Sequence, residues 1–171
     1  KFAFVIEPSK EVESRNQGKF IEAKNISPSY TDAEAEAVMA VFQFMIGNTD
    51  WSVKALHNVR VMAFEHMKKP IAVPYDFDFS GIVNAPYALP AEELDINSVR
   101  QRHFNGFCKT DAEFEQAFKV FIEKKQLIIG IFNDCEFLTE SKRKQAVKYI
   151  DSFYEIITDD KRARSEIINK C

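Results

Sequence analysis

The sequence is poor in the residues that interrupt regular structure, with five Gly and six Pro among 171 residues. Hydrophobic residues make up 46% and charged residues 29%, a balance that is typical of globular proteins and excludes a disordered or fibrous chain. Sixteen Phe accompany this shortage of turn residues. Together they predict a large aromatic core built mainly from helices, at a length that suits one domain over 1–171.

Long apolar runs and a large excess of one charge are also absent from the sequence. No apolar run approaches the roughly 20 residues that a membrane-spanning helix needs, so we expect no membrane span. The formal net charge of -3 gives no electrostatic reason to expect nucleic acid as a partner.

Cysteine is scarce, and the three cysteines lack the spacing of a zinc site. Cys108, Cys135 and Cys171 lie far apart in the chain. Two arrangements stay open: one disulfide with one free thiol, or three buried thiols.

The first residue is Lys1, and the residues directly after it are already typical of a buried strand. We therefore expect a piece of a longer protein. Localisation stays open, and a secreted or periplasmic place would fit if a signal peptide had been removed.

Two segments carry the capping pattern that begins a helix, in which a Thr is followed three residues later by a Glu. Thr31 and Glu34 form the first pair, and Thr110 and Glu113 form the second. The first pair predicts a helix over 32–46, since Gly-Asn follows and stops it.

The C-terminal region, 98–171, is expected to be helical, with its apolar run 127–132 in the centre of the core. Near the N-terminus, Pro8 and Ser9 can open a short helix, whereas 16–28 is polar and expected to be irregular. The predicted fold class is therefore α+β, predominantly helical.

Between Asn58 and Asp78 the hydrophobic period changes from helical to alternating, which predicts a β-hairpin over 58–78. If the turn centres on Met67, Asn58 lies directly opposite Asp76 at the open end of the hairpin. Pro74 cannot donate a ladder hydrogen bond, so the second strand should be an edge strand or end early.

Asp50 follows the predicted helix and lies close in sequence to Asn58, so a short loop should bring it to the open end of the hairpin. An Asn amide oxygen beside one or two carboxylates is a hard, oxygen-rich ligand set that suits magnesium and bound phosphate. A carboxylate that stays off the metal could orient or deprotonate a hydroxyl. The alternative interpretation is that these residues are caps and turn residues, which is the usual role of Asp and Asn beside helices and strands.

Three short motifs follow one another in this part of the chain. The segment Gly47–Asp50 reads Gly-Asn-Thr-Asp, His57 and Asn58 lead a strand, and Pro74–Asp78 reads Pro-Tyr-Asp-Phe-Asp. In this order the motifs resemble those of the atypical protein-kinase-like families. The pattern is similar to that of the spore-coat CotH-type kinases and, more distantly, of the toxin kinase HipA. The stretch 51–106 also resembles a group of uncharacterised Bacteroidetes proteins that share its Asp-Phe-Asp-Phe-Ser-Gly, Asn-Ala-Pro-Tyr-Ala and Ser-Val-Arg-x-Arg segments.

The resemblance implies a role for each matching residue. Asp50 corresponds to the catalytic-loop Asp, while Asn58 and Asp76 correspond to the metal-binding Asn and Asp. His57 and Asp78 would lie on the cofactor side of the site, although a histidine in this position is more often structural. The implied cofactors are Mg²⁺ and ATP, and the implied partners are a nucleotide and an unknown acceptor.

On the same resemblance the chain is a kinase-like C-terminal lobe with a small β-hairpin, in which 1–7 is the hinge-like strand and 80–90 replaces the activation or substrate loop. The glycine-rich loop and the phosphate-binding Lys would belong to a missing N-terminal lobe, for which Lys24 and Lys54 are poor substitutes. Arg100 and Arg102, expected on a following helix, could bind phosphate or pair with surface acids.

Three functions follow from these observations. The first is the C-terminal lobe of an ATP- and magnesium-dependent phosphotransferase, inactive without its N-terminal lobe. The second is a non-catalytic kinase-like module for binding or scaffolding. The third is a metal-dependent hydrolase that uses the same acids, although no cluster of His ligands accompanies them.

Overall fold

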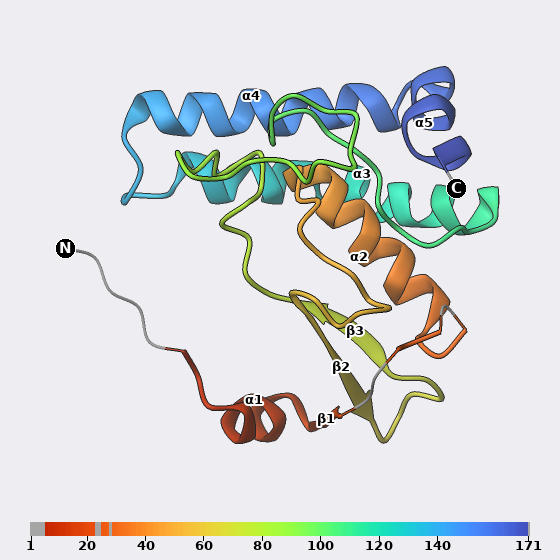
Figure 1. Cartoon of the computed structure of the whole chain (residues 1–171). Helices are drawn as coiled ribbons and strands as arrows, with labels where there is room; N and C mark the ends of the chain where they lie inside the picture. Colours follow the sequence, from red (N-terminus) through yellow and green to blue (C-terminus); the bar gives the residue numbers. More distant parts are fainter. Residues whose placement is uncertain (1–5, 23–24, 28, 171) are drawn as a thin grey trace.

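The computed structural model describes residues 6–22, 25–27 and 29–170, and it is α+β with a small antiparallel sheet, as predicted. Its elements run in the order α1 (Ser9–Asn16), β1 (Gly18–Ile21), α2 (Ala33–Ile46), β2 (Val59–Phe64), β3 (Ile71–Pro74), α3 (Asp111–Asn133), α4 (Glu140–Ile157), α5 (Asp160–Glu166) and a short 3-10 helix (Ile168–Lys170). Figure 1 shows α2 between the sheet and the antiparallel pair α3 and α4. The resulting core buries aromatic rings from all three helices, such as Phe44, Phe114 and Phe153.

The sheet has the order β1-β2-β3, so β2 is central and β3 is an edge strand. β3 also ends at Pro74. Its place at the edge and its end at this proline confirm the prediction that the strand is an edge strand or ends early. β1 lies in the region expected to be irregular, and that expectation was wrong. This four-residue strand has no alternating pattern of its own and takes its regularity from pairing with β2. The Arg60 guanidinium, which lies 3.5 Å from the centre of the Phe20 ring, adds a cation–π contact between the two strands.

The predicted hairpin is present, but its register differs by one residue from the prediction. Val59 pairs with Pro74, and the amide of Tyr75 donates to the carbonyl oxygen of Asn58 at 3.0 Å. Asn58 therefore lies opposite Tyr75 rather than Asp76. The physical reason is that the residues between the last ladder pair, Met62 and Ile71, are 63–70, so the turn is centred between His66 and Met67 instead of on Met67.

The start of α2 corrects the first capping prediction by one residue. Asp32, not Thr31, is the N-cap, and its carboxylate accepts the amide of Ala35 at 3.0 Å. A carboxylate also interacts favourably with the positive end of the helix dipole, which favours Asp over the adjacent Thr. The helix ends as predicted at Gly47, which adopts the left-handed conformation with φ 68°.

The second capping pattern is confirmed at the start of α3. The Thr110 hydroxyl accepts the amide of Glu113 at 3.3 Å, and the Glu113 carboxylate accepts the amide of Thr110 at 2.8 Å. The prediction that 127–132 lies in the centre of the core was wrong, because Leu127 is 70% exposed and Ile131 is 68% exposed. α3 is longer than the core that it packs on, so its C-terminal half buries only one side.

The region 98–110 contains turns and extended chain rather than the expected helix. The Arg102 guanidinium donates to the carbonyl oxygens of Met45 and Tyr149 and to the hydroxyl of Ser152, and it lies 3.9 Å from the centre of the Tyr149 ring. Burial lowers the pKa of this guanidinium. Arg102 therefore ties the connecting segment to α2 and α4 and takes neither of the roles that were weighed for it.

Some predictions fall on parts of the chain that lie outside the described ranges. The hinge-like strand was predicted over 1–7; of these, residues 1–5 are not described, and Ile6 and Glu7 belong to no strand. Lys24 and Cys171 are not described either. Cys108 is an exposed free thiol and Cys135 is a partly exposed one, so the alternative with three buried thiols was wrong. Among the helices of the described ranges, none has the length and apolar character that crossing a membrane requires.

A buried ion pair joins α2 to the start of α3. The ammonium nitrogen of Lys109 lies 2.5 Å from a carboxylate oxygen of Glu36, and these side chains are 7% and 0% exposed. Burial is the largest influence on the Glu36 carboxyl and raises its pKa, while Lys109 acts in the opposite direction.

Candidate functional site

The backbone that presents Asp50 is fixed by a buried amide side chain. The Asn48 side chain donates to Gln43 at 3.1 Å, and its own oxygen accepts the amide of Asp50 at 3.1 Å. The indole of buried Trp51 donates to the Asn48 carbonyl at 3.1 Å. The chain that leaves α2 is thus held in one conformation up to the residue after Asp50.

The loop after Asp50 folds back on itself. Ser52 and His57 form an isolated antiparallel bridge, with backbone hydrogen bonds of 2.9 and 3.0 Å. The turn requires Leu56 to adopt φ 54°, a strained conformation for a side chain of this size. As a result His57 and Asn58 return to the side of Asp50 before β2 begins.

The returning residues hold both oxygens of the Asp50 carboxylate. His57 Nε2 lies 2.7 Å from one oxygen, and Asn58 Nδ2 donates to the other at 3.0 Å and to the Asp50 carbonyl at 2.8 Å. The Asp50 side chain is still 38% exposed. Because the Asn58 nitrogen is used on Asp50, the amide oxygen is the part of that side chain that is left for another ligand.

Asp76 is the second residue after β3 and has φ 58°, and Asn58, just before β2, has φ 50°. Both residues lie outside the regular strands, where side chains no longer alternate between the two faces of the sheet. The shifted register therefore does not by itself place the side chains of Asn58 and Asp76 on opposite faces. The pKa of Asp76 is raised, first by partial loss of hydration, then by a hydrogen bond to Asp78 and by its charge, and also by the charge of Asp50. The negative charges of Asp78 and Asp50 therefore both act on the Asp76 carboxyl.

The segment 80–90 folds back toward these acids through Tyr87. Its hydroxyl donates to Asp78 at 3.1 Å, and its ring lies 5.9 Å from that of Phe79. The hydrogen bond and charge of Asp78 raise the pKa of the Tyr87 hydroxyl. Beside Asp50 a hollow of about 210 Å³ is lined by Thr49, Asp50, Phe79, Leu89 and Ala91.

The structure thus links Asp50, His57 and Asn58 by hydrogen bonds, and it places Asp76 and Asp78 within electrostatic range of one another. No signal in the sequence predicts Tyr87 as the partner of an acid. Tyr87 lies in a segment without helix or strand, where no periodicity predicts which way a side chain turns.

The oxygen atoms of Asn58 and Asp76 fit magnesium in their chemistry, because this ion prefers hard oxygen ligands and retains several waters or phosphate oxygens. Within the part of the chain that the structure describes, no three His, Cys, Asp or Glu side chains converge as an all-protein metal site. A magnesium ion held here would therefore complete its coordination with water or substrate oxygens.

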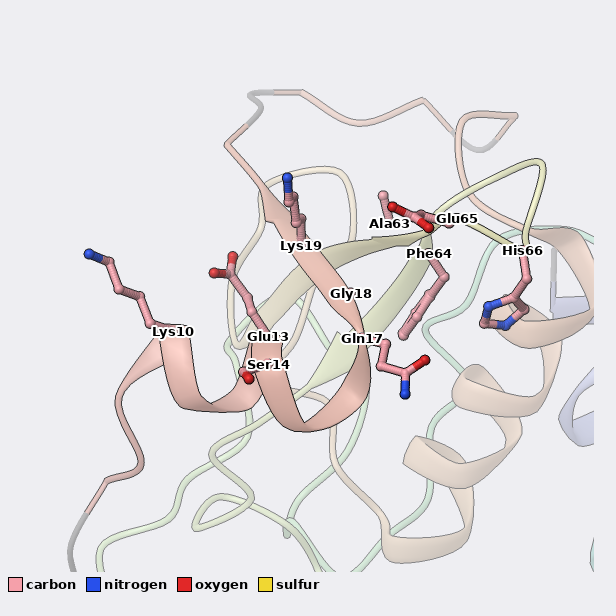
Figure 2. Close-up of a pocket in the computed structure, with 10 residues that line it drawn as sticks. All are labelled: Lys10, Glu13, Ser14, Gln17, Gly18, Lys19, Ala63, Phe64, Glu65 and His66. Atoms are coloured by element: carbon pink, nitrogen blue, oxygen red, sulfur yellow. The ribbon is translucent and has the colours of Figure 1, made fainter.

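A larger hollow of about 920 Å³ lies elsewhere, between α1, β1 and the end of β2 (Figure 2). It is near the opposite end of β2 from Asn58. Its lining mixes the cations Lys10 and Lys19 with the carboxylates of Glu13 and Glu65, so it selects no charge class of ligand.

Comparisons with protein families, with curated proteins and with solved structures find no match to this chain.

Proposed function

We propose that this chain is the C-terminal lobe of an atypical, CotH-like phosphotransferase that uses ATP and Mg²⁺. The observation that supports the proposal is the Asp50 carboxylate, which His57 and Asn58 hold by hydrogen bonds and whose charge acts on Asp76. Phosphoryl transfer needs mainly positioning and charge neutralisation, and this arrangement can supply both on one side of a nucleotide.

Each side chain has a distinct task in this proposal. One Asp50 oxygen, which keeps a free lone pair beside its hydrogen bond, would orient the acceptor hydroxyl and accept its proton. His57 would hold Asp50 in place rather than contact the cofactor. Asn58 and Asp76 would hold the metal through oxygen, with Asp78 as a further acidic contact. Bound Mg²⁺ would neutralise charge on the transferring phosphoryl oxygens.

The phosphate-binding Lys and the glycine-rich loop would come from a lobe outside residues 1–171. The proposal therefore expects weak nucleotide binding and no useful turnover by this chain alone. Lys54 is the candidate substitute for the phosphate-binding Lys that lies within the described part of the chain. It forms no ion pair there, and it lies in the loop between Ser52 and His57.

Calorimetric titration with ATP, with and without Mg²⁺, tests the proposal. We expect heat of binding that depends on Mg²⁺ and is lost in Asp76→Ala, because that carboxylate is a proposed metal ligand. Asp95→Ala is the matched control, since Asp95 is an exposed acid of the segment between β3 and α3. Unchanged binding in Asp76→Ala, or equal losses in both variants, would remove the site assignment.

The second candidate is a non-catalytic kinase-like binding or scaffold module. Two observations favour it: Tyr87 already occupies Asp78 through a hydrogen bond, and the loop between Asp50 and Asn58 is longer than in ordinary kinases. On this alternative the same titration gives no heat, and Tyr87→Phe does not restore it.

A further inference from the structure

The C-terminal half of α3 carries an apolar stripe that stays exposed among the residues that the structure describes. Leu127 is 70% exposed and Ile131 is 68% exposed, and they lie four residues apart on one face of the helix. The C-terminal end of α3 lies at the end of the α3–α4 pair that is farthest from α5 (Figure 1). Leaving two large aliphatic side chains in water next to each other is unfavourable, which indicates a surface that another molecule covers.

Charged residues of opposite sign flank this stripe. Lys124 and Asp134 continue it in steps of three residues, so that Lys124, Leu127, Ile131 and Asp134 follow a helical seam with coiled-coil spacing. Both charged residues are exposed, and neither forms an ion pair with another residue in the described ranges. The neighbouring cation Lys125 differs, because it pairs with Asp151 of α4 at 3.0 Å.

Gly130 flanks this seam, and within the described part of the chain no close packing requires a glycine there. A Cβ added there would meet only the Asp134 carboxylate, at 3.9 Å, which is an ordinary contact. Glycine inside a helix costs about 0.5–1 kcal/mol relative to alanine. Its presence leaves an open strip of backbone between Leu127 and Ile131, and such a strip allows a second helix to approach closely.

We propose that α3 pairs with α3 of a second copy of this chain in an antiparallel, two-fold symmetric contact. With the crossing at residue 129, Leu127 of each copy lies opposite Ile131 of the other, and Lys124 lies opposite Asp134. A parallel pairing would place Lys124 beside Lys124 and Asp134 beside Asp134. The distribution of charge therefore selects the antiparallel arrangement, and a second copy is the occupant whose charges match without further assumptions.

Sedimentation velocity of the chain over a range of concentrations tests this pairing. We expect a species of twice the 19.7 kDa of one chain. Lys124→Asp and Asp134→Lys should each raise the dissociation constant at least about tenfold, because each places like charges opposite each other. The double variant Lys124→Asp/Asp134→Lys should restore the dimer, since it exchanges the two charges without changing their complementarity.

Leu127→Lys should abolish the dimer, and Ile122→Lys is its matched control. Ile122 is also apolar and is 46% exposed, but it lies on another face of α3. Circular dichroism verifies that each variant folds, as expected for exposed positions. A wild-type chain that stays at the mass of one copy at all concentrations would overturn the proposal and indicate a different occupant. A double variant no better than its parents, or an equal effect of both lysine substitutions, would overturn it as well.

Discussion

The buried pair between Glu36 and Lys109 gives the sharpest test of how this fold is held together. In Lys109→Met the aliphatic part of the side chain is kept, but Glu36, which is 0% exposed, loses its counter-ion. Breaking one partner of a buried ion pair costs about 3–5 kcal/mol, because the remaining charge cannot be hydrated. We expect a loss of that size in the free energy of unfolding at pH 7, measured by denaturation in urea.

A matched surface pair controls for the loss of a lysine as such. Lys144 lies 2.5 Å from Glu140, the same distance as in the buried pair, but these side chains are 76% and 75% exposed. Lys144→Met should cost less than about 0.5 kcal/mol, because exposed helix pairs contribute little. The difference in unfolding free energy between the two variants therefore reports the effect of burial, because the ion-pair distance is the same in both.

The pKa of Glu36 determines whether the free energy of unfolding rises or falls with pH. Burial raises the pKa of the Glu36 carboxyl, so its contribution to stability is present below the unfolded-state pKa and is lost as the pH rises through the folded-state value. Without Lys109 the raised pKa increases further, and the penalty should shrink as the pH falls and Glu36 becomes neutral. A Lys109→Met variant with a loss below about 1 kcal/mol at pH 7, or with no pH dependence, would refute this reasoning. The double variant Glu36→Leu/Lys109→Met should be close to wild type in stability.

Local patterns were predicted well where one interaction decides the outcome. The Thr110 cap of α3 and the Gly47 end of α2 need only neighbouring residues, and both are observed. Where two adjacent residues can do the same task, as Thr31 and Asp32 can at a helix start, the pattern alone does not choose between them. The choice depends on the helix dipole and on the amide of Asp32, which donates to Pro70 in the next connection.

Features that depend on distant parts of the chain could not be predicted in this way. The hairpin register depends on whether the turn is centred on a residue or between two, and the composition of 63–70 does not settle that. The run 127–132 is apolar enough for a core, yet burial requires a partner on each side, and among the described elements only α2 and α4 pack on α3, on one side of it. The convergence of Asp50 with Asn58 was predictable because a short loop joins them, whereas the Tyr87 contact with Asp78 depends on the path of a long irregular segment.

Two further predictions concern the residues around the candidate site. Gly47→Ala should lower stability by about 1–3 kcal/mol, since Gly47 has φ 68° and an added Cβ would overlap the Tyr149 hydroxyl; adding Tyr149→Phe should recover part of the loss in thermal unfolding. Asp76→Asn should raise the melting temperature of the metal-free chain at pH 7. Partial loss of hydration and the Asp78 carboxylate raise the pKa of Asp76, so its ionised form lowers stability as the pH rises through that pKa. Because the side chain is exposed, the gain should stay below about 1 kcal/mol, and it should vanish at acidic pH, where wild-type Asp76 is neutral too. Equal melting temperatures at pH 7, or a gain that persists in acid, would mean that repulsion among these carboxylates does not act on the fold.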